Sequence, residues 1–256
     1  MTSGSDDYDS RTSLDVNALS SFQCGAALFY GCKSRLFINR NAQKRLKKPS
    51  ISVVWNYYRT FVTVNQTYAA MFSLKVRPEI IQHCQEQIKK YNFGQRCVAN
   101  GTPDQQLTGI IGQTVIMDLF GLGFIDGSTG FDNGVDIVYE GVRMDVKTMG
   151  RTTDVRKDYV NNFIALQINF NTDVYVFCSY NKTKNELTVC GWTTKADFLK
   201  KAHFFPKGST RTRSDGTTFE TFADLYEIAN KDLVNVDSID ELKACLIEIK
   251  KAERVE

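Results

Sequence analysis

Three side chains capable of catalysis lie close together in the segment GFDNGVDIVYEGVRMDVKTMG, residues 130–150. Asp136 interrupts one apolar run, Asp145 interrupts the next, and Lys147 follows two residues later. The Glu140-Gly141 pair between the runs predicts a two-residue hairpin turn. That turn would place Asp136 opposite Asp145 on one sheet face, with their Cβ atoms about 5 Å apart. Lys147 is predicted on the same face, because side chains alternate along a strand.

Two carboxylates that face one another repel, so the arrangement needs a compensating charge. A divalent cation supplies it, and all-oxygen ligands favour Mg²⁺, which binds through one or two carboxylates together with substrate phosphate oxygens. A lysine beside such a site can orient water or stabilise charge that develops on a phosphate. The structural alternative is a solvated strand face, and a change of one residue in the loop would break the facing register.

The order Asp136, a short gap, then Asp145-Val146-Lys147 resembles the signature of the PD-(D/E)XK, or restriction-endonuclease-like, nuclease superfamily. The resemblance implies that Asp136 and Asp145 bind Mg²⁺, with Mn²⁺ as a substitute. It also implies that the Val146 carbonyl lies at the metal and that Lys147 assists the attacking water. The preceding helix usually brings a glutamate to the metal, and the matching residue here is Gln113. Glutamine adds no negative charge, so one or two metal ions remain possible.

The elements that must position these residues follow from periodicity and turn signals. Apolar residues recur at helical spacing after Pro78 and again along QQLTGIIGQTVIMDLF, which precedes the hairpin. Strands are predicted at FIALQINF, DVYVFCSYN and ELTVCGW, then a helix at TTKADFLKKAHF, a flexible basic loop at PKGSTRTRSDGTT and a strand at ADLYEIA. A terminal helix opens at Ser238 with a capping box to Glu241. This mixture predicts an α/β (α+β) fold, and the resemblance implies a restriction-endonuclease-like mixed central β-sheet flanked by helices.

Composition and charge divide the chain into two parts. Its 256 residues, 42% hydrophobic, can bury one substantial core. Residues 1–30 are rich in Ser, Asp and Gly, whereas residues 31–70 hold eight Lys or Arg and no Asp or Glu. We therefore predict an N-terminal extension, residues 1–70, partly disordered and basic, and a nuclease-like domain, residues 71–256. Whether the extension is an accessory segment or adds little is left open.

Two further features bear on the compartment. No run of about 18 apolar residues occurs, and the polar N-terminus does not have the pattern of a signal peptide. We expect a cytoplasmic or nucleoid-associated protein with no membrane partner. Seven cysteines form no CxxC pair, so reduced, mostly buried thiols are expected instead of structural zinc or disulfides.

Basic and amide side chains downstream of the trio are candidates for DNA binding. The loop after the catalytic strand and the later basic loop could contact phosphates, or could simply be solvated. By resemblance a glutamine in FIALQINF could approach the active site, although a glutamine bonded to backbone is equally compatible. The candidates are Arg151, Arg156, Lys157, Gln167, Arg211 and Arg213.

The function predicted from these residues is a Mg²⁺-dependent endonuclease that hydrolyses DNA phosphodiester bonds, of a restriction-like, phage or mobile-element type. The resemblance implies products with a 5′-phosphate and a 3′-hydroxyl. Two alternatives stay open: a non-catalytic nucleic-acid-binding protein on the same fold, and an RNA-directed nuclease. Cleavage of both strands of a duplex would favour a homodimer by symmetry.

Overall fold

The computed structural model describes residues 71–94, 100–212 and 216–253. The predictions for the N-terminal extension and its boundary at residue 70 lie outside the described residues, and so does Arg213.

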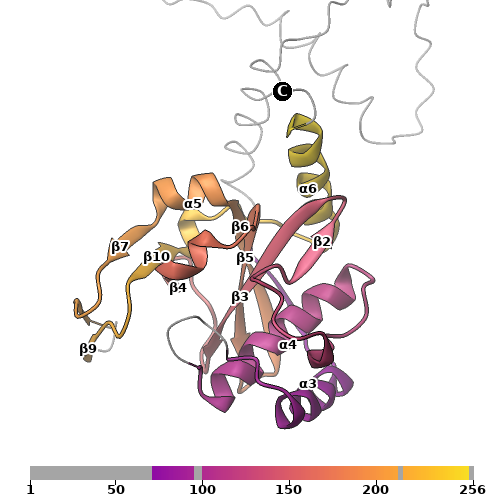
Figure 1. Ribbon diagram of the computed structural model, residues 1–256, viewed down its shortest axis with the longest axis horizontal. Coiled ribbons are helices and arrows are strands. Elements are labelled where there is room, and N and C mark those ends of the chain that lie inside the picture. Colours follow the sequence, from indigo (N-terminus) through magenta and orange to yellow (C-terminus); the bar gives the residue numbers. More distant parts are fainter. Residues whose placement is uncertain (1–70, 95–99, 213–215, 254–256) are drawn as a thin grey trace, which may run out of the picture. The chain divides into compact units, whose positions relative to one another are not determined.

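A five-stranded mixed sheet forms the centre of the described fold, in the order β1-β6-β5-β3-β2 (Figure 1). Neighbouring strands are antiparallel except β3 and β5, which are parallel. All eight residues of β5 are buried, because it is the middle strand and both of its faces are covered. The predicted α/β class is therefore confirmed. The strands are β1 (Phe72–Lys75), β2 (Ile137–Tyr139), β3 (Val142–Arg151), β5 (Val174–Asn181) and β6 (Glu186–Thr194).

Three helices, α3 (Pro78–Lys90), α4 (Pro103–Leu119) and α6 (Ile239–Glu253), pack their apolar residues into the core on one face of this sheet. Helix α4 lies against β3, and Figure 1 shows α3 beside it. Helix α4 begins with a capping box between Thr102 and Gln105. Within it, Gly112 permits close approach, since a Cβ added there would lie 1.8 Å from the Thr148 Oγ1 of β3.

The opposite face of the sheet carries a smaller antiparallel sheet in the order β4-β10-β7. An aromatic core joins the two sheets: Phe163 lies 4.8 Å from Tyr175 and 5.0 Å from Phe198, measured between ring centroids. Such tilted ring pairs stabilise beyond their buried area. The remaining elements are β4 (Val160–Ile164), α5 (Lys195–Lys201), β7 (His203–Phe205), β8 (Thr210–Thr212), β9 (Thr218–Glu220) and β10 (Leu225–Ala229).

Several predicted boundaries are wrong. The strand expected over FIALQINF ends at Ile164, where the chain turns into the 3₁₀ helix η2 (Ala165–Asn169) after pairing with β10. The predicted basic loop, residues 206–218, contains β8 and the first residue of β9, which pair as a two-stranded ribbon. The terminal helix is confirmed, and the Ser238 Oγ accepts the predicted bond from the Glu241 N–H at 3.2 Å.

Two composition-based expectations also have a structural counterpart. Cys84, Cys178 and Cys190 are free and buried, as expected for reduced thiols. Among the described residues, every helix is too short or too polar to cross a membrane.

Candidate active site

The β2–β3 hairpin has the predicted register along β2. Both turn residues have positive φ, 50° at Glu140 and 80° at Gly141, as a type I′ turn requires. The fourth predicted pair, Asp136 with Asp145, lies beyond the end of β2. There the Asp136 N–H donates to the Met144 carbonyl at 2.9 Å. The backbone of Asp136 is therefore bonded to the residue before Asp145 and not to Asp145 itself. The three confirmed pairs are Ile137 with Met144, Val138 with Arg143 and Tyr139 with Val142.

The displaced Asp136 caps an open strand edge. Its Oδ2 accepts a hydrogen bond from the Val146 N–H at 2.6 Å. Strand β2 pairs with β3 only as far as Met144, so no described strand pairs with that side of β3 from Asp145 onward. The N–H and C=O of one strand residue point to the same side. The Val146 carbonyl therefore points to the open edge where the Asp136 carboxyl lies.

Asp145 contributes a buried carboxylate oxygen that has no partner. The residue is only 1% exposed, and its Oδ1 lies 2.8 Å from the Lys147 Nζ, but its Oδ2 has no N–H donor beside it. Its side-chain neighbour is the Asp136 carboxyl, which can bond to it only when one of the two carries a proton. The Lys147 ammonium also lies 5.4 Å from the centroid of the Phe163 ring, which holds it against the aromatic core. A buried carboxylate oxygen without a partner is costly, so this atom needs a proton or a cation.

The electrostatics of the site are dominated by carboxyl groups. Burial, and then the neighbouring Asp145 and Asp132, raise the pKa of Asp136 well above its usual value, although Lys147 lowers it. Burial also raises the pKa of Asp145; Lys147 opposes this effect and Asp132 adds to it. Asp132 was not predicted as a site residue, and its Oδ1 accepts a hydrogen bond from the Gly134 N–H at 2.8 Å. The Asp-Asn-Gly turn just ahead of the hairpin is the signal that could have revealed it.

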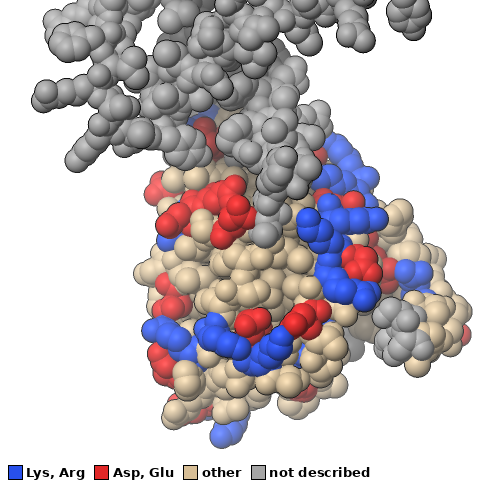
Figure 2. Space-filling view, turned by 180° about the vertical axis from the view of Figure 1, so that it is seen from behind, with Lys and Arg blue, Asp and Glu red and all other residues tan. Residues whose placement is uncertain are grey.

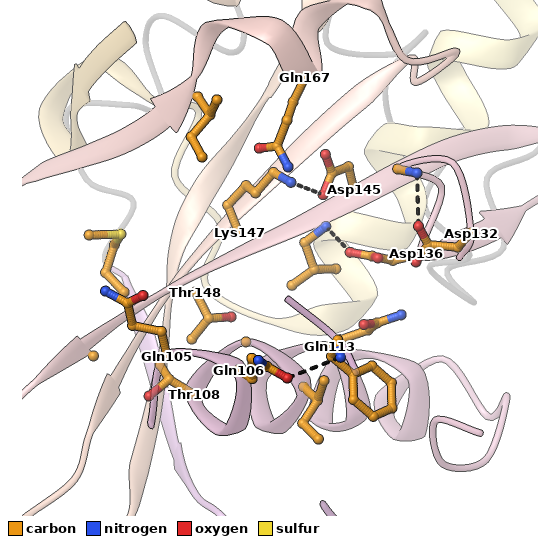
Figure 3. Close-up of a pocket in the computed structure, with 18 of the residues that line it drawn as sticks. Gln105, Gln106, Thr108, Gln113, Asp132, Asp136, Asp145, Lys147, Thr148 and Gln167 are labelled. Carbon is orange, nitrogen blue, oxygen red and sulfur yellow. Dashed lines mark hydrogen bonds and ion pairs between the residues drawn. The ribbon is translucent and has the colours of Figure 1, made fainter. Parts of the chain in front are cut away.

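A cleft of about 470 Å³ surrounds the open edge of β3 (Figure 3). Gln167 projects from η2 toward the Lys147 ammonium and Asp145, on the side of β3 away from α4. Gln113 projects from α4 on the other side of the strand, so the cleft wraps around the edge. The structure thus brings six predicted residues together in one cleft: Gln113, Asp136, Asp145, Val146, Lys147 and Gln167.

The predicted DNA-binding basic residues in the described chain do not line this cleft. The Arg151 guanidinium donates to the Val160 carbonyl at 2.8 Å and lies over the Tyr159 ring. Two others form ion pairs within the protein, Arg156 with Asp158 and Arg211 with Glu227, and Lys157 is exposed. On the face seen in Figure 2, basic side chains lie directly beside acidic ones. Contact of these residues with DNA stays a prediction.

The oxygen atoms at the open edge of β3 are suitable ligands for a hard cation. The carboxylates of Asp136 and Asp145 and the carbonyl of Val146 are all oxygen ligands, which Mg²⁺ prefers over nitrogen or sulfur. Within the described ranges, no group of three or more His, Cys, Asp or Glu side chains is arranged to hold a metal ion. A two-carboxylate site is nevertheless the kind that Mg²⁺ occupies together with waters and substrate phosphate. The Asp145 Oδ2 is the atom that such an ion would satisfy.

Comparison with protein-family models, with curated proteins and with solved structures gave no match.

Proposed function

We propose that this chain is a Mg²⁺-dependent nuclease that hydrolyses DNA phosphodiester bonds, on a fold of the PD-(D/E)XK type. The observation that carries the proposal is the Asp145 Oδ2, buried without a partner beside a lysine at the floor of a cleft. A buried carboxylate pair with an adjacent ammonium matches hydrolysis of a phosphodiester better than it matches a purely structural sheet edge.

Each residue has its own role in the proposed mechanism. Asp136, Asp145 and the Val146 carbonyl hold the ion, and Mg²⁺ when bound polarises a phosphoryl oxygen and lowers the pKa of bound water. The Lys147 ammonium, fixed by its 2.8 Å contact with the Asp145 Oδ1, donates hydrogen bonds to the attacking water and to the phosphate. The water oxygen bonds to phosphorus and the bond from phosphorus to the 3′-oxygen breaks, with a proton passing to the leaving oxygen. The products carry a 5′-phosphate and a 3′-hydroxyl.

Two amides complete the site in this proposal. The Gln167 amide, beside Lys147, is placed to hold a phosphate oxygen or the attacking water. Gln113 lies on the α4 side of the strand edge and, being uncharged, orients water without adding to the negative charge. With two carboxylates as ligands, one ion is expected to suffice.

The test is cleavage of labelled DNA with Mg²⁺, with EDTA, and with three variants. Asp145→Asn and Lys147→Met should each lose at least about 100-fold in rate, because each removes a charge that stabilises the transition state. Asp197→Asn, at an exposed aspartate on α5, is the control and should cleave like the wild type. Cleavage that persists in EDTA or in Asp145→Asn would refute the proposal. A labelled RNA of the same sequence distinguishes the RNA-directed alternative, and binding without cleavage of either polymer would favour the non-catalytic one.

A further inference from the structure

The depth of the Asp145 carboxylate limits what can reach it. Asp145 is 1% exposed at the floor of a cleft of about 470 Å³, between α4 on one side and the β4–η2 segment on the other. That volume falls in the range of about 300–1,000 Å³ found for small-molecule sites, which is enough for a nucleotide-sized group.

An exposed aromatic ring stands at one end of the cleft. Phe131 lines the cleft directly before Asp132 and is 40% exposed. Its ring packs edge-to-face on Phe170, with centroids 5.7 Å apart. Phe170 is itself fixed against the backbone of Gly134, where an added Cβ would lie 2.2 Å from the ring. Phe131 is therefore a supported apolar surface beside the carboxylates, of the kind on which a base stacks.

A cation stands at the other end of the open edge. The Lys182 side chain lies against Gly150, where an added Cβ would be 2.8 Å from its Cε, and it lines the cleft. Its ammonium forms an ion pair with the Asp104 carboxylate, which also lines the cleft. The five residue-to-residue steps from Asp145 to Gly150 span about 16 Å of strand. Between the two ends, the β4 wall presents the Asn162 Oδ1, a buried acceptor without a partner that also faces the cleft. An aromatic ring, the lysine of the carboxylate site, an acceptor without a partner and a second lysine thus line the same cleft.

We propose that the substrate of this site is an unpaired DNA strand, laid along the open edge of β3 with a base stacked on Phe131 and its backbone directed toward Lys182. This inference rests on the proposed nuclease function and specifies its substrate class. Stacking on a protein ring tolerates any base, so the site selects unpaired strands and not a particular sequence.

The experiment measures binding by fluorescence anisotropy, with Ca²⁺ in place of Mg²⁺, for a labelled single strand and for the blunt duplex of the same sequence. Wild type should bind the single strand more tightly than the duplex. Phe131→Ala should weaken single-strand binding about 5- to 100-fold, the effect of about 1–3 kcal/mol of stacking, and Phe131→Trp should restore it. Phe222→Ala is the matched control, because Phe222 is 56% exposed and lies outside the cleft.

The outcomes separate this inference from the nuclease proposal. If wild type binds and cuts the duplex as well as the single strand, or if Phe131→Ala binds like the wild type, the inference is overturned. Cleavage that depends on Asp145 would still uphold the nuclease. If unpaired DNA is preferred through Phe131 but Mg²⁺ brings no cleavage, the nuclease proposal fails, and the site binds an unpaired strand without using it as a substrate.

Discussion

Asp136 is tied to the backbone of Val146, because its Oδ2 accepts the Val146 N–H at 2.6 Å across the open edge of β3. One carboxyl group thus fixes the orientation of the peptide whose carbonyl points into the cleft. Strand β2 begins at Ile137, which pairs with Met144, so β2 offers no acceptor for the Val146 N–H. The Asp136 carboxyl takes the place of that missing strand acceptor. The Asp136 side chain is therefore both a candidate metal ligand and a structural support for the backbone of β3.

Mg²⁺ should stabilise the wild-type fold and should not stabilise Asp145→Asn. An ion that binds only the folded state adds about 2.7 kcal/mol at a concentration 100 times its Kd. The unpartnered Asp145 Oδ2 is the atom that makes this binding favourable. Differential scanning fluorimetry in EDTA and in Mg²⁺ measures the change in Tm, with Asp197→Asn as the control. An equal Mg²⁺ shift in Asp145→Asn would place the ion elsewhere.

In EDTA, stability should fall as the pH rises from about 4 toward neutral. The pKa of Asp136 is well above its usual 3.8 in the folded protein, so between the unfolded and folded values the folded state binds more protons. The stabilising contribution of protonated Asp136 is fully present below the pKa that it has in the unfolded state. It is lost as the pH rises through the higher pKa that it has in the folded state. Urea unfolding across this range measures the slope. Asp136→Asn should flatten it, and an unchanged slope in that variant would contradict the assignment.

Lys147→Met should separate catalysis from metal binding. In the proposed mechanism the ammonium stabilises charge on the reacting groups, so its loss should lower kcat by about 10²- to 10³-fold. The Mg²⁺-dependent rise in Tm should persist, because both carboxylates remain. Single-turnover cleavage and thermal melts on one preparation test both parts. Loss of the Mg²⁺ shift together with activity would show that Lys147 holds the site together and does not act on substrate.

Gly112→Ala should destabilise the protein, whereas Gly109→Ala in the same helix should not. A Cβ at Gly112 would lie 1.8 Å from the Thr148 Oγ1, so α4 must move away from β3, at a cost of about 1–3 kcal/mol. A Cβ at Gly109 would meet nothing within 4 Å, and alanine is favoured over glycine in a helix by about 1 kcal/mol. Chemical denaturation compares the two. Adding Thr148→Ala to Gly112→Ala should recover part of the loss, and equal stability of the two single variants would contradict the close packing.

Local patterns predicted the parts of the site that depend on neighbouring residues. The alternation around Asp145 and Lys147 placed both on one face, and the Glu140-Gly141 turn set the register of β2 with β3. The end of β2 was not predictable in this way. Whether Asp136 pairs across the strand or turns its carboxyl to the Val146 N–H depends on the preceding loop, whose path is set by contact of Gly134 with the distant Phe170.

Long-range packing accounts for the remaining differences. The predicted strand over FIALQINF stops at Ile164, because β4 pairs with β10, some sixty residues downstream, and the chain then turns into η2. That turn carries Gln167 to the cleft. The partner of Arg211, Glu227, is likewise on another strand, so that ion pair does not follow from the charge pattern of a loop, whereas Arg156 pairs with Asp158 only two residues away.

An unpaired strand edge is also where foreign chains can add themselves to a sheet. From Asp145 onward, β3 presents such an edge, flanked by α4 and by the β4–η2 segment. These two flanks leave room for a slender polymer while limiting side-by-side association with another sheet. Mutations that open the flanks should therefore promote aggregation as well as impair turnover.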